Sequence, residues 1–305
     1  MIVDSHLHLM QKKNFDVETN RKLGMKIPDD TPLPKLVSWL KEAGVEKAVV
    51  MGQDMSRIWK TSFGEDYVLK AQTAYPHFFL ALASVEPLNE ANSFNQIAYD
   101  HLCESVEEHG FRGVLLTPPY GQYNSNDRTA YPFYKFAQEA GIIVQFHHSA
   151  QIGPSILAPT RYASMFNLND IMIDFPGMKI VVEHLGYPFS EHLFVLMAND
   201  KNLWADLAMT FVRPTWLAWN LVLAKEYGVV DRIMYASDYV AAGYDLLSQN
   251  PAEDFRSWID FLRRELNRIC DNAGWPTFSK KEIEGFLGGN AARLYGLETG
   301  SHQKT

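Results

Sequence analysis

The stretch Gly141-Ile142-Ile143-Val144-Gln145-Phe146-His147 decides the fold class, because it joins three signals. The segment before it, Tyr131–Ala140, has helical character. Gly141 then ends the helix, since glycine adopts the left-handed conformation without steric cost. The apolar, β-branched run that follows predicts a buried strand, and a histidine stands at its end. The sequence therefore predicts a unit of helix, glycine and strand.

The same unit recurs along the chain. Glycine stands shortly before further apolar runs at Gly44, Gly110, Gly177 and Gly228. With the first run included, eight strands are predicted: Ile2–Ser5, Lys47–Met51, Phe78–Val85, Gly113–Leu116, Ile142–Phe146, Lys179–Glu183, Leu203–Leu207 and Arg232–Ala236. Strands that alternate with helices pair in parallel through crossover connections. About eight such units in roughly 250 residues are typical of a (β/α)8 barrel.

An open doubly wound sheet is the alternative, but it typically carries a glycine-rich dinucleotide motif directly after a strand. The glycine pair near the C-terminus, Gly288-Gly289, precedes a helix and follows no strand. We therefore expect an α/β protein with a (β/α)8 TIM barrel. One domain is expected over residues 1–298, followed by a flexible tail at residues 299–305.

Two longer segments interrupt the alternation. Gln11–Thr31 follows the first predicted strand, and Gln151–Asn169 follows the fifth. Barrel enzymes build their active sites from the loops that follow strands. We therefore expect both extended loops to act as lids or to bind substrate.

Composition excludes several classes of protein. The formal net charge of the 305 residues is −8, which argues against binding to nucleic acid or to an anionic membrane surface. No uncharged apolar run approaches the roughly 20 residues of a membrane span. The only cysteines, Cys103 and Cys270, are far apart, which excludes a thiolate zinc cluster and a disulfide scaffold. Asp4 would interrupt a leader peptide, so we expect a cytoplasmic protein.

Potential metal ligands follow four of the predicted strands. His6 and His8 stand at the end of the first strand, His147 after the fifth, His184 after the sixth and Asp238 after the eighth. Residues two apart in a strand point to the same face, and the carboxyl ends of barrel strands meet at one mouth. Imidazoles and a carboxylate suit Zn²⁺, Mn²⁺ or Fe²⁺. The pattern predicts a metal site that activates water for attack.

Each signal has an ordinary structural explanation when taken alone. A His-x-His pair such as His6-Leu7-His8 is weak evidence for a metal, and a single histidine at a strand end is often structural. An aspartate after a strand commonly caps a helix. The joint pattern over four strands favours the metal site.

The sequence resembles the amidohydrolase superfamily, in the branch of aminocarboxymuconate-semialdehyde decarboxylase, resorcylate-type decarboxylases and several lactone hydrolases. The resemblance spans almost the whole chain. It rests on Asp4-Ser5-His6-Leu7-His8, Gln145-Phe146-His147, Glu183-His184-Leu185-Gly186-Tyr187-Pro188, Tyr235-Ala236-Ser237-Asp238-Tyr239 and Gly289-Asn290-Ala291-Ala292-Arg293-Leu294-Tyr295. It implies that His6, His8, His147 and Asp238 bind one divalent metal, usually zinc, and that His184 is the catalytic acid or base. Asp238 is a second candidate for accepting the proton of the attacking water.

Two positions refine what the resemblance implies. His147 and His148 are adjacent, and the family motif places the ligand directly after the apolar run, which favours His147. His148 then supports the site or contacts the substrate. The fourth strand, Gly113–Leu116, lacks the lysine or glutamate of binuclear members, which indicates a single metal. His6 stands where resorcylate-type decarboxylases often have glutamate, which mildly disfavours that reaction.

Substrate contacts are less well indicated by the sequence. An arginine at the mouth could bind a substrate carboxylate with two hydrogen bonds, although each arginine could equally lie on the surface. The candidates, with neighbouring aromatic residues and the second histidine, are Arg57, Trp59, His148, Arg161, Tyr162 and Arg213. Glu86 and Asp206, at the ends of the third and seventh strands, are either acids that support the site or strand caps.

The leading functional prediction is a mononuclear metal-dependent hydrolase. Metal-activated water would attack an ester, lactone or amide carbonyl of a small, carboxylated organic substrate. The alternative is metal-dependent, non-oxidative decarboxylation, or hydration, of an unsaturated or aromatic acid at the same site. The ligand set does not distinguish these reactions, since fold and metal do not fix the chemistry. A non-catalytic, ligand-binding barrel is a third possibility. Family analogy suggests a homodimer.

Overall fold

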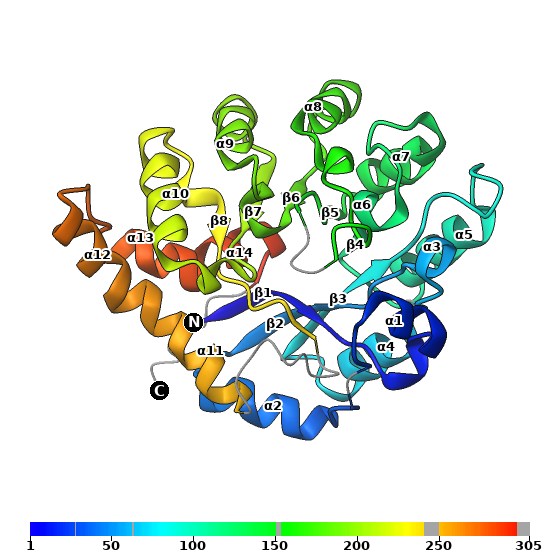
Figure 1. Cartoon of the computed structure of the whole chain (residues 1–305), viewed down its shortest axis with the longest axis horizontal. Helices are drawn as coiled ribbons and strands as arrows, with labels where there is room; N and C mark the ends of the chain where they lie inside the picture. Colours follow the sequence, from blue (N-terminus) through cyan, green and yellow to red (C-terminus); the bar gives the residue numbers. More distant parts are fainter. Residues whose placement is uncertain (28, 63, 151–153, 241–249, 298–305) are drawn as a thin grey trace, which may run out of the picture.

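A single curled sheet of nine parallel strands forms the centre of the molecule (Figure 1). The computed structural model describes residues 1–27, 29–62, 64–150, 154–240 and 250–297. Neighbouring strands follow the chain in order, from β8 back to β1, with β9 beside β1. The strands are β1 Val3–His8, β2 Lys47–Met51, β3 Phe79–Ser84, β4 Gly113–Leu116, β5 Ile143–Phe146, β6 Ile180–Val182, β7 Leu203–Asp206, β8 Ile233–Met234 and β9 Tyr239–Val240.

The last two strands close the barrel. β8 pairs with β7, and β9 pairs with β1, so the two short strands act as the two halves of an eighth barrel strand. Between them the chain stays bonded to β1: Ser5 donates its backbone N–H to the carbonyl of Tyr235, and Asp238 donates to the carbonyl of His6. The predicted strand Arg232–Ala236 is therefore corrected to this interrupted form, and Arg232 lies in a short 3-10 helix, Val230–Arg232. The TIM-barrel prediction is confirmed.

Helices surround the sheet, as Figure 1 shows. The longer ones between strands are α2 Leu33–Glu42, α4 Glu65–Ala74, α5 Gln96–Glu107, α7 Tyr131–Ala140, α8 Met165–Asp174, α9 Ser190–Asn199 and α10 Pro214–Glu226. After the last strand come α11 Pro251–Asp260, α12 Leu266–Ala273, α13 Lys280–Glu284 and α14 Asn290–Tyr295. Gly141 ends α7 with φ 69°, as the helix-glycine-strand unit predicts. No helix in the described ranges is long and apolar enough to cross a membrane.

A bulge in β1 decides which way its histidines point. Pairing with β2 runs from Val3 opposite Lys47 to His8 opposite Met51. Over this paired length β1 contains one residue more than β2. Val3 packs inside the barrel, whereas Leu7 packs between the sheet and the helices. Strict alternation from Val3 would put Leu7 inside. The extra residue shifts the phase, so that His6 and His8 face the interior.

The apolar core has two layers. The larger lies between the sheet and the surrounding helices. The smaller fills the barrel and includes Val49, Leu115 and Val181, and α14 packs against it through Leu294 and Tyr295. The floor of the barrel is thus closed, and the open end is where the carboxyl ends of the strands meet.

The two extended loops contain short helices. The loop after β1 holds a 3-10 helix, Lys12–Asn14, and α1, Val17–Leu23. The loop after β5 holds a 3-10 helix, Thr160–Ala163, before α8 begins at Met165. Two shorter helices, α3 Ser56–Trp59 and α6 Pro118–Gly121, follow β2 and β4. Residues 151–153 of the second extended loop, and the predicted tail at 299–305, lie outside the described residues.

Candidate metal centre

Three of the predicted ligands lie together at the mouth of the barrel. The Nε2 atoms of His6 and His8 are 2.9 Å apart, and Asp238 Oδ1 is 3.3 Å from each of them. His6 and His8 are buried, and the Asp238 side chain is 19% exposed. Three convergent donor atoms from two strand ends are the arrangement expected of a metal site.

The tautomers of the two histidines follow from their outer partners. His6 Nδ1 is 3.0 Å from Asp206 Oδ2, and His8 Nδ1 is 3.0 Å from the carbonyl oxygen of Gly52. Carboxylate and carbonyl oxygens accept, so each Nδ1 carries a proton, and each neutral ring presents a lone pair at Nε2. Two lone pairs then face each other at hydrogen-bond distance. This arrangement needs a cation between the rings or a proton on one of them.

The surrounding charge also favours a cation. Burial lowers the pKa of His6, but the carboxylates of Glu183, Asp238 and Asp206 outweigh burial and raise this pKa to about 10. Burial alone would raise the pKa of Asp238, whereas the neighbouring histidines lower it to about 2. The site therefore stabilises positive charge at its centre. A divalent ion bound by neutral imidazoles satisfies this requirement, and the residues fit such an ion.

The fourth predicted ligand belongs to an adjoining group. His147 Nδ1 lies 3.0 Å from Glu183 Oε2 and 3.1 Å from His184 Nε2. The other oxygen of Glu183, Oε1, is 3.4 Å from His6 Nε2, so this carboxylate links the two groups. Gln145 holds Glu183 by a 2.8 Å hydrogen bond from Nε2. All donor atoms within each group lie within 4.8 Å of one another.

His184 reaches the site from a turn directly after β6. Its Nδ1 is 2.9 Å from the carbonyl oxygen of Ala208, and Asp238 Oδ2 is 4.0 Å away. His184 and Asp238 both have positive φ, 57° each. Non-glycine residues adopt this conformation rarely and at some energetic cost, and such residues concentrate at functional sites. The backbone thus turns both side chains toward the mouth.

Asp206 connects the histidines of the two groups. Its Oδ2 accepts from His6 Nδ1, and its Oδ1 accepts from the backbone N–H groups of His184 and Ala208, at 2.8 and 3.0 Å. The sequence predicts Asp206 to be either an acid that supports the site or a strand cap. In the structure Asp206 contacts both the His6 ring and the backbone that follows β6 and β7.

His148 faces away from this centre. Its Nε2 is 3.0 Å from Ser125 Oγ, and burial lowers its pKa to about 3. The neighbouring His147 points into the site and contacts the ring of Tyr120, with ring centroids 4.6 Å apart. The two histidines therefore lie on opposite sides of the chain, as their adjacency in a strand predicts.

The three candidate arginines are engaged with protein groups. The Arg57 side chain is 7% exposed, contacts Glu86 at 3.5 Å and donates to Asn92 and to the carbonyl of Gly121. Burial raises the pKa of Glu86 to about 7 although Arg57 opposes this shift.

The other two arginines stack on aromatic rings. Arg161 is exposed and lies over Tyr162, at 4.7 Å from the ring centroid. Arg213 lies over Tyr187, at 4.9 Å. The substrate roles predicted for Arg57, Arg161, Tyr162 and Arg213 stay predictions.

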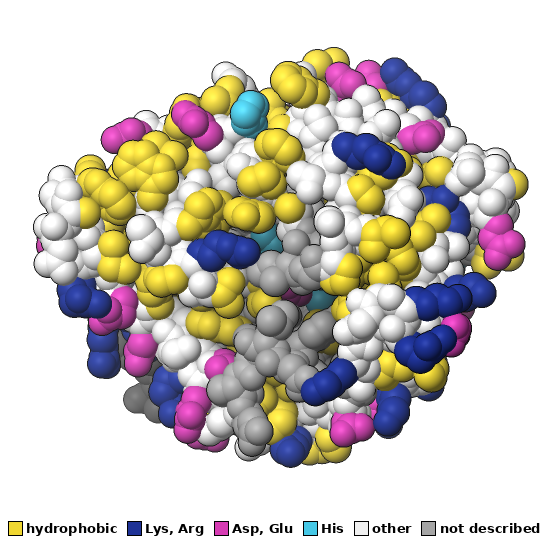
Figure 2. Space-filling view, in the orientation of Figure 1, with side chains coloured by type: hydrophobic (Ala, Val, Ile, Leu, Met, Phe, Trp, Pro, Cys, Tyr) yellow, Lys and Arg dark blue, Asp and Glu magenta, His cyan; other side chains and the backbone are white. Residues whose placement is uncertain are grey.

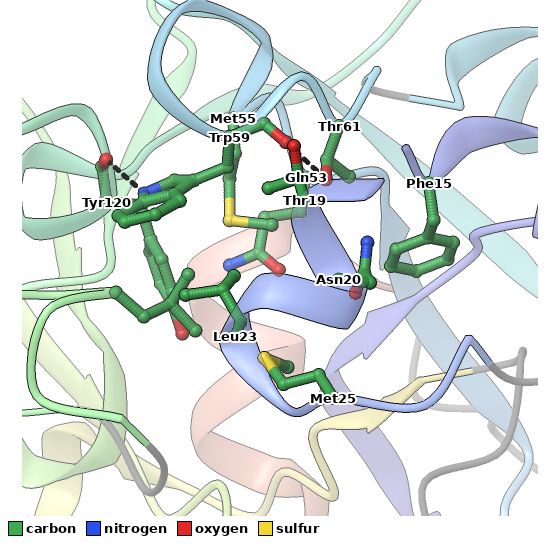
Figure 3. A pocket seen from close by; sticks show the side chains of 11 residues that line it. Phe15, Thr19, Asn20, Leu23, Met25, Gln53, Met55, Trp59, Thr61 and Tyr120 are labelled. Carbon is green, nitrogen blue, oxygen red and sulfur yellow. Dashed lines mark hydrogen bonds between the residues drawn. The ribbon is translucent and has the colours of Figure 1, made fainter. Parts of the chain in front are cut away.

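A pocket is lined by residues from the segments that follow β1, β2, β4 and β5 (Figure 3). One lining residue, Tyr120, contacts the ring of His147. Trp59 and Tyr120 lie on one side of the pocket, and Trp59 Nε1 donates to the Tyr120 carbonyl at 2.9 Å. The pocket encloses about 360 Å³, counting space open to solvent. The space-filling view shows histidine and acidic atoms at the bottom of the hollow in the middle of this face (Figure 2). The lining residues are Phe15, Thr19, Asn20, Leu23, Met25, Gln53, Met55, Trp59, Thr61, Tyr120 and Leu157.

Sequence reasoning did not single out Glu183, Tyr120 or Gln53 for the site. Glu183 had a detectable signal, because it is an acidic residue at the end of an apolar strand and therefore had to be paired once buried. Tyr120 lies in the short helix α6 after β4, and Gln53 lies in the loop after β2. The sequence pattern gives no side-chain direction at either position.

A parallel barrel with convergent histidine and carboxylate donors at its mouth defines a class, the metal-dependent barrel enzymes. The chain belongs to the amidohydrolase family, since the family model described as amidohydrolase matches residues 3–297. No curated protein sequence matches the chain. The resemblance noted from the sequence motifs is thereby confirmed at the level of the family.

Solved structures share the fold at low sequence identity. An uncharacterised TIM-barrel protein from Bordetella bronchiseptica is 21% identical, with TM-score 0.71 and coverage of 97% of this chain and 98% of the other. A probable 2-pyrone-4,6-dicarboxylic acid hydrolase from Acinetobacter baumannii with citric acid bound is 18% identical, with TM-score 0.67 and coverage of 97% and 99%. A dihydroxybenzoic acid decarboxylase from Polaromonas with manganese and 2-nitroresorcinol is 14% identical, with TM-score 0.63 and coverage of 100% and 99%.

Proposed function

We propose that the protein is a mononuclear metal-dependent hydrolase of small esters or lactones. The observation that carries the proposal is the 2.9 Å approach of the His6 and His8 Nε2 atoms, surrounded by carboxylates. His6, His8 and Asp238 would hold the ion. The resemblance to the family adds His147, from the adjoining group, as the fourth ligand. Zinc is the proposed ion, and Mn²⁺ and Fe²⁺ suit the same donors.

A bound divalent ion would polarise the substrate carbonyl and lower the pKa of a water molecule at the open position. His184 is the proposed general base. Its Nδ1–H donates to the Ala208 carbonyl, which leaves the lone pair at Nε2 to accept a proton. Asp238 Oδ2 is the second candidate acceptor, because it faces His184 rather than the two ligand histidines. The same groups would return the proton to the leaving group.

Decarboxylation of an aromatic or unsaturated acid, or a hydration, is the second candidate. One observation favours it: the pocket beside the centre has an aromatic wall made by Trp59 and Tyr120, which suits a flat ring. Solved structures that share the fold include decarboxylases at 14% and 13% identity and a hydratase at 17% identity. His6 stands in place of the glutamate that resorcylate-type decarboxylases often carry, and this keeps hydrolysis first.

The experiment is a reaction panel with a variant. The zinc-loaded protein is assayed for acid release from lactones and esters, and for carbon dioxide release from carboxylated aromatics. We expect hydrolysis without carbon dioxide release. His184→Gln should retain bound metal and lower kcat by about 10²–10⁴, the usual contribution of a general base. Carbon dioxide release alone would contradict the proposal and establish the second candidate.

A cytoplasmic location and a homodimer also stay proposals, tested by fractionation of cells and by light scattering. The division into a domain at 1–298 and a tail at 299–305 is tested by limited proteolysis.

A further inference from the structure

The pocket beside the candidate metal centre is placed to hold the part of a substrate that does not react. Its wall residue Tyr120 contacts the His147 ring, with centroids 4.6 Å apart. Its residue Gln53 directly follows Gly52, whose carbonyl accepts from His8 Nδ1. Both contacts put the pocket beside the centre, at the carboxyl ends of β2 and β4. A group bound here would lie next to a carbonyl presented to the centre.

The lining of this pocket carries no charged side chain. Among its described residues there is no lysine, arginine, histidine, aspartate or glutamate. Arg57, the arginine nearest to Trp59 in the sequence, is engaged with Glu86, Asn92 and the Gly121 carbonyl. The segments outside the described ranges and before residue 298 contain no lysine or arginine in their sequence. A carboxylate bound here would lose water without gaining a cationic partner from the lining side chains, which is costly.

The shape and chemistry of the walls suit a flat ring. Trp59 is fixed by its hydrogen bond to the Tyr120 carbonyl, and Met55, Tyr120 and Leu157 form a small buried apolar cluster beneath it. Leu23 packs against the same cluster from the segment after β1.

Gln53 supplies the polar contact. Its side chain is half-buried and has no hydrogen-bond partner in the described part of the chain. Figure 3 shows its carboxamide reaching into the pocket. A carboxamide offers an acceptor and two donors, so it pairs with an uncharged hydroxyl or carbonyl group.

We propose that this pocket selects an uncharged, flat cyclic ester, a lactone whose ring lies against Trp59 and whose hydroxyl or carbonyl substituent pairs with Gln53. The inference rests on the proposed function for the reacting carbonyl, and it replaces the carboxylated substrate expected from the sequence. Gln53 is thereby a residue that determines specificity.

Binding is tested without turnover, so that the result does not depend on hydrolysis. The probes are hydrocarbostyril with a hydroxyl on its aromatic ring, the lactam analogue of a hydroxydihydrocoumarin, and hydrocarbostyril with a carboxylate in place of that hydroxyl. Calorimetry on the zinc-loaded protein should give a Kd for the uncharged lactam at least about tenfold lower than for the carboxylate. Gln53→Leu should weaken binding of the uncharged lactam about tenfold, the usual effect of one lost hydrogen bond. Gln53→Arg should reverse the preference.

The matched control is Gln138→Leu. Gln138 is also half-buried, but it lies in the last turn of α7, at the end of the barrel away from the mouth, and bonds to the Pro176 carbonyl. This variant should bind both probes as the wild type does. Equal or tighter binding of the carboxylate by the wild type, no binding of either probe, or no effect of Gln53→Leu would overturn the inference. Selective binding of the lactam without hydrolysis of the matching hydroxydihydrocoumarin would instead contradict only the proposed function.

Discussion

At the scale of single residues, Asp206 makes two parts of the site depend on one carboxylate. One oxygen fixes the tautomer of His6, and the other fixes the backbone of His184. Groups that hold a metal-binding histidine by its outer nitrogen orient the ring and raise its basicity. Asp206 is fully buried, so water cannot replace either contact.

Asp206→Asn should therefore weaken the proposed metal site. An amide has one acceptor and one donor end, so its NH₂ group must face either His6 Nδ1–H or the N–H groups of His184 and Ala208. Competition with a chromogenic chelator should show a loss of metal affinity of about 10–100-fold. Asp200→Asn, at the end of α9 before β7, is the control and should leave the affinity unchanged. Unchanged affinity in Asp206→Asn would show that Asp206 has only a structural role.

The residue scale also shows what could be anticipated from the sequence. The period of a strand predicts that His6 and His8 share a face, and their Nε2 atoms do meet. The position of Glu183 between His6 and His147 could not be predicted, because it depends on the reach and rotamer of its side chain. The orientation of the Gln53 side chain could not be predicted either, because it also depends on the rotamer.

At the scale of elements, strand pairing determines where the histidines point. The register of β1 against β2 contains one extra residue, and this bulge turns His6 and His8 inward. Sequence alternation alone gives no indication of it, since only pairing with a neighbour shows a bulge. The split of the last strand into β8 and β9 escaped prediction likewise, because Asp238 interrupts it with a positive φ.

Close packing between elements is tested at Gly113, the first residue of β4. A Cβ there would lie 2.5 Å from the Ile143 carbonyl oxygen and 2.9 Å from Leu82 Cδ2, so the backbone of β5 would have to move and the Leu82 side chain would have to shift. Gly113→Ala should lower the free energy of unfolding by about 1–3 kcal/mol, the usual cost of overpacking. Gly289→Ala is the control, because its nearest contact is an ordinary 3.4 Å. Denaturant unfolding measures both; equal stability of the two variants would contradict this packing.

At the scale of the whole molecule, closure of the barrel brings distant residues into one site. β9 pairs with β1, which places Asp238 beside His6 and His8 across more than two thirds of the chain. The alternation of helices and strands was sufficient to predict this closure, because parallel strands joined by helices form few architectures. The reaction catalysed at the mouth of the barrel could not be predicted from the fold, since one fold serves several reactions.

The central claim is that the donors at the mouth hold one divalent ion that the protein needs for hydrolysis. The direct test measures metal content by mass spectrometry and lactone hydrolysis on the same sample, before and after treatment with a chelator. The account predicts about one ion per chain, loss of both ion and activity with the chelator, and recovery of both when zinc is added. His6→Ala should lose ion and activity together. A chain that contains no metal and hydrolyses lactones at an undiminished rate would contradict the account.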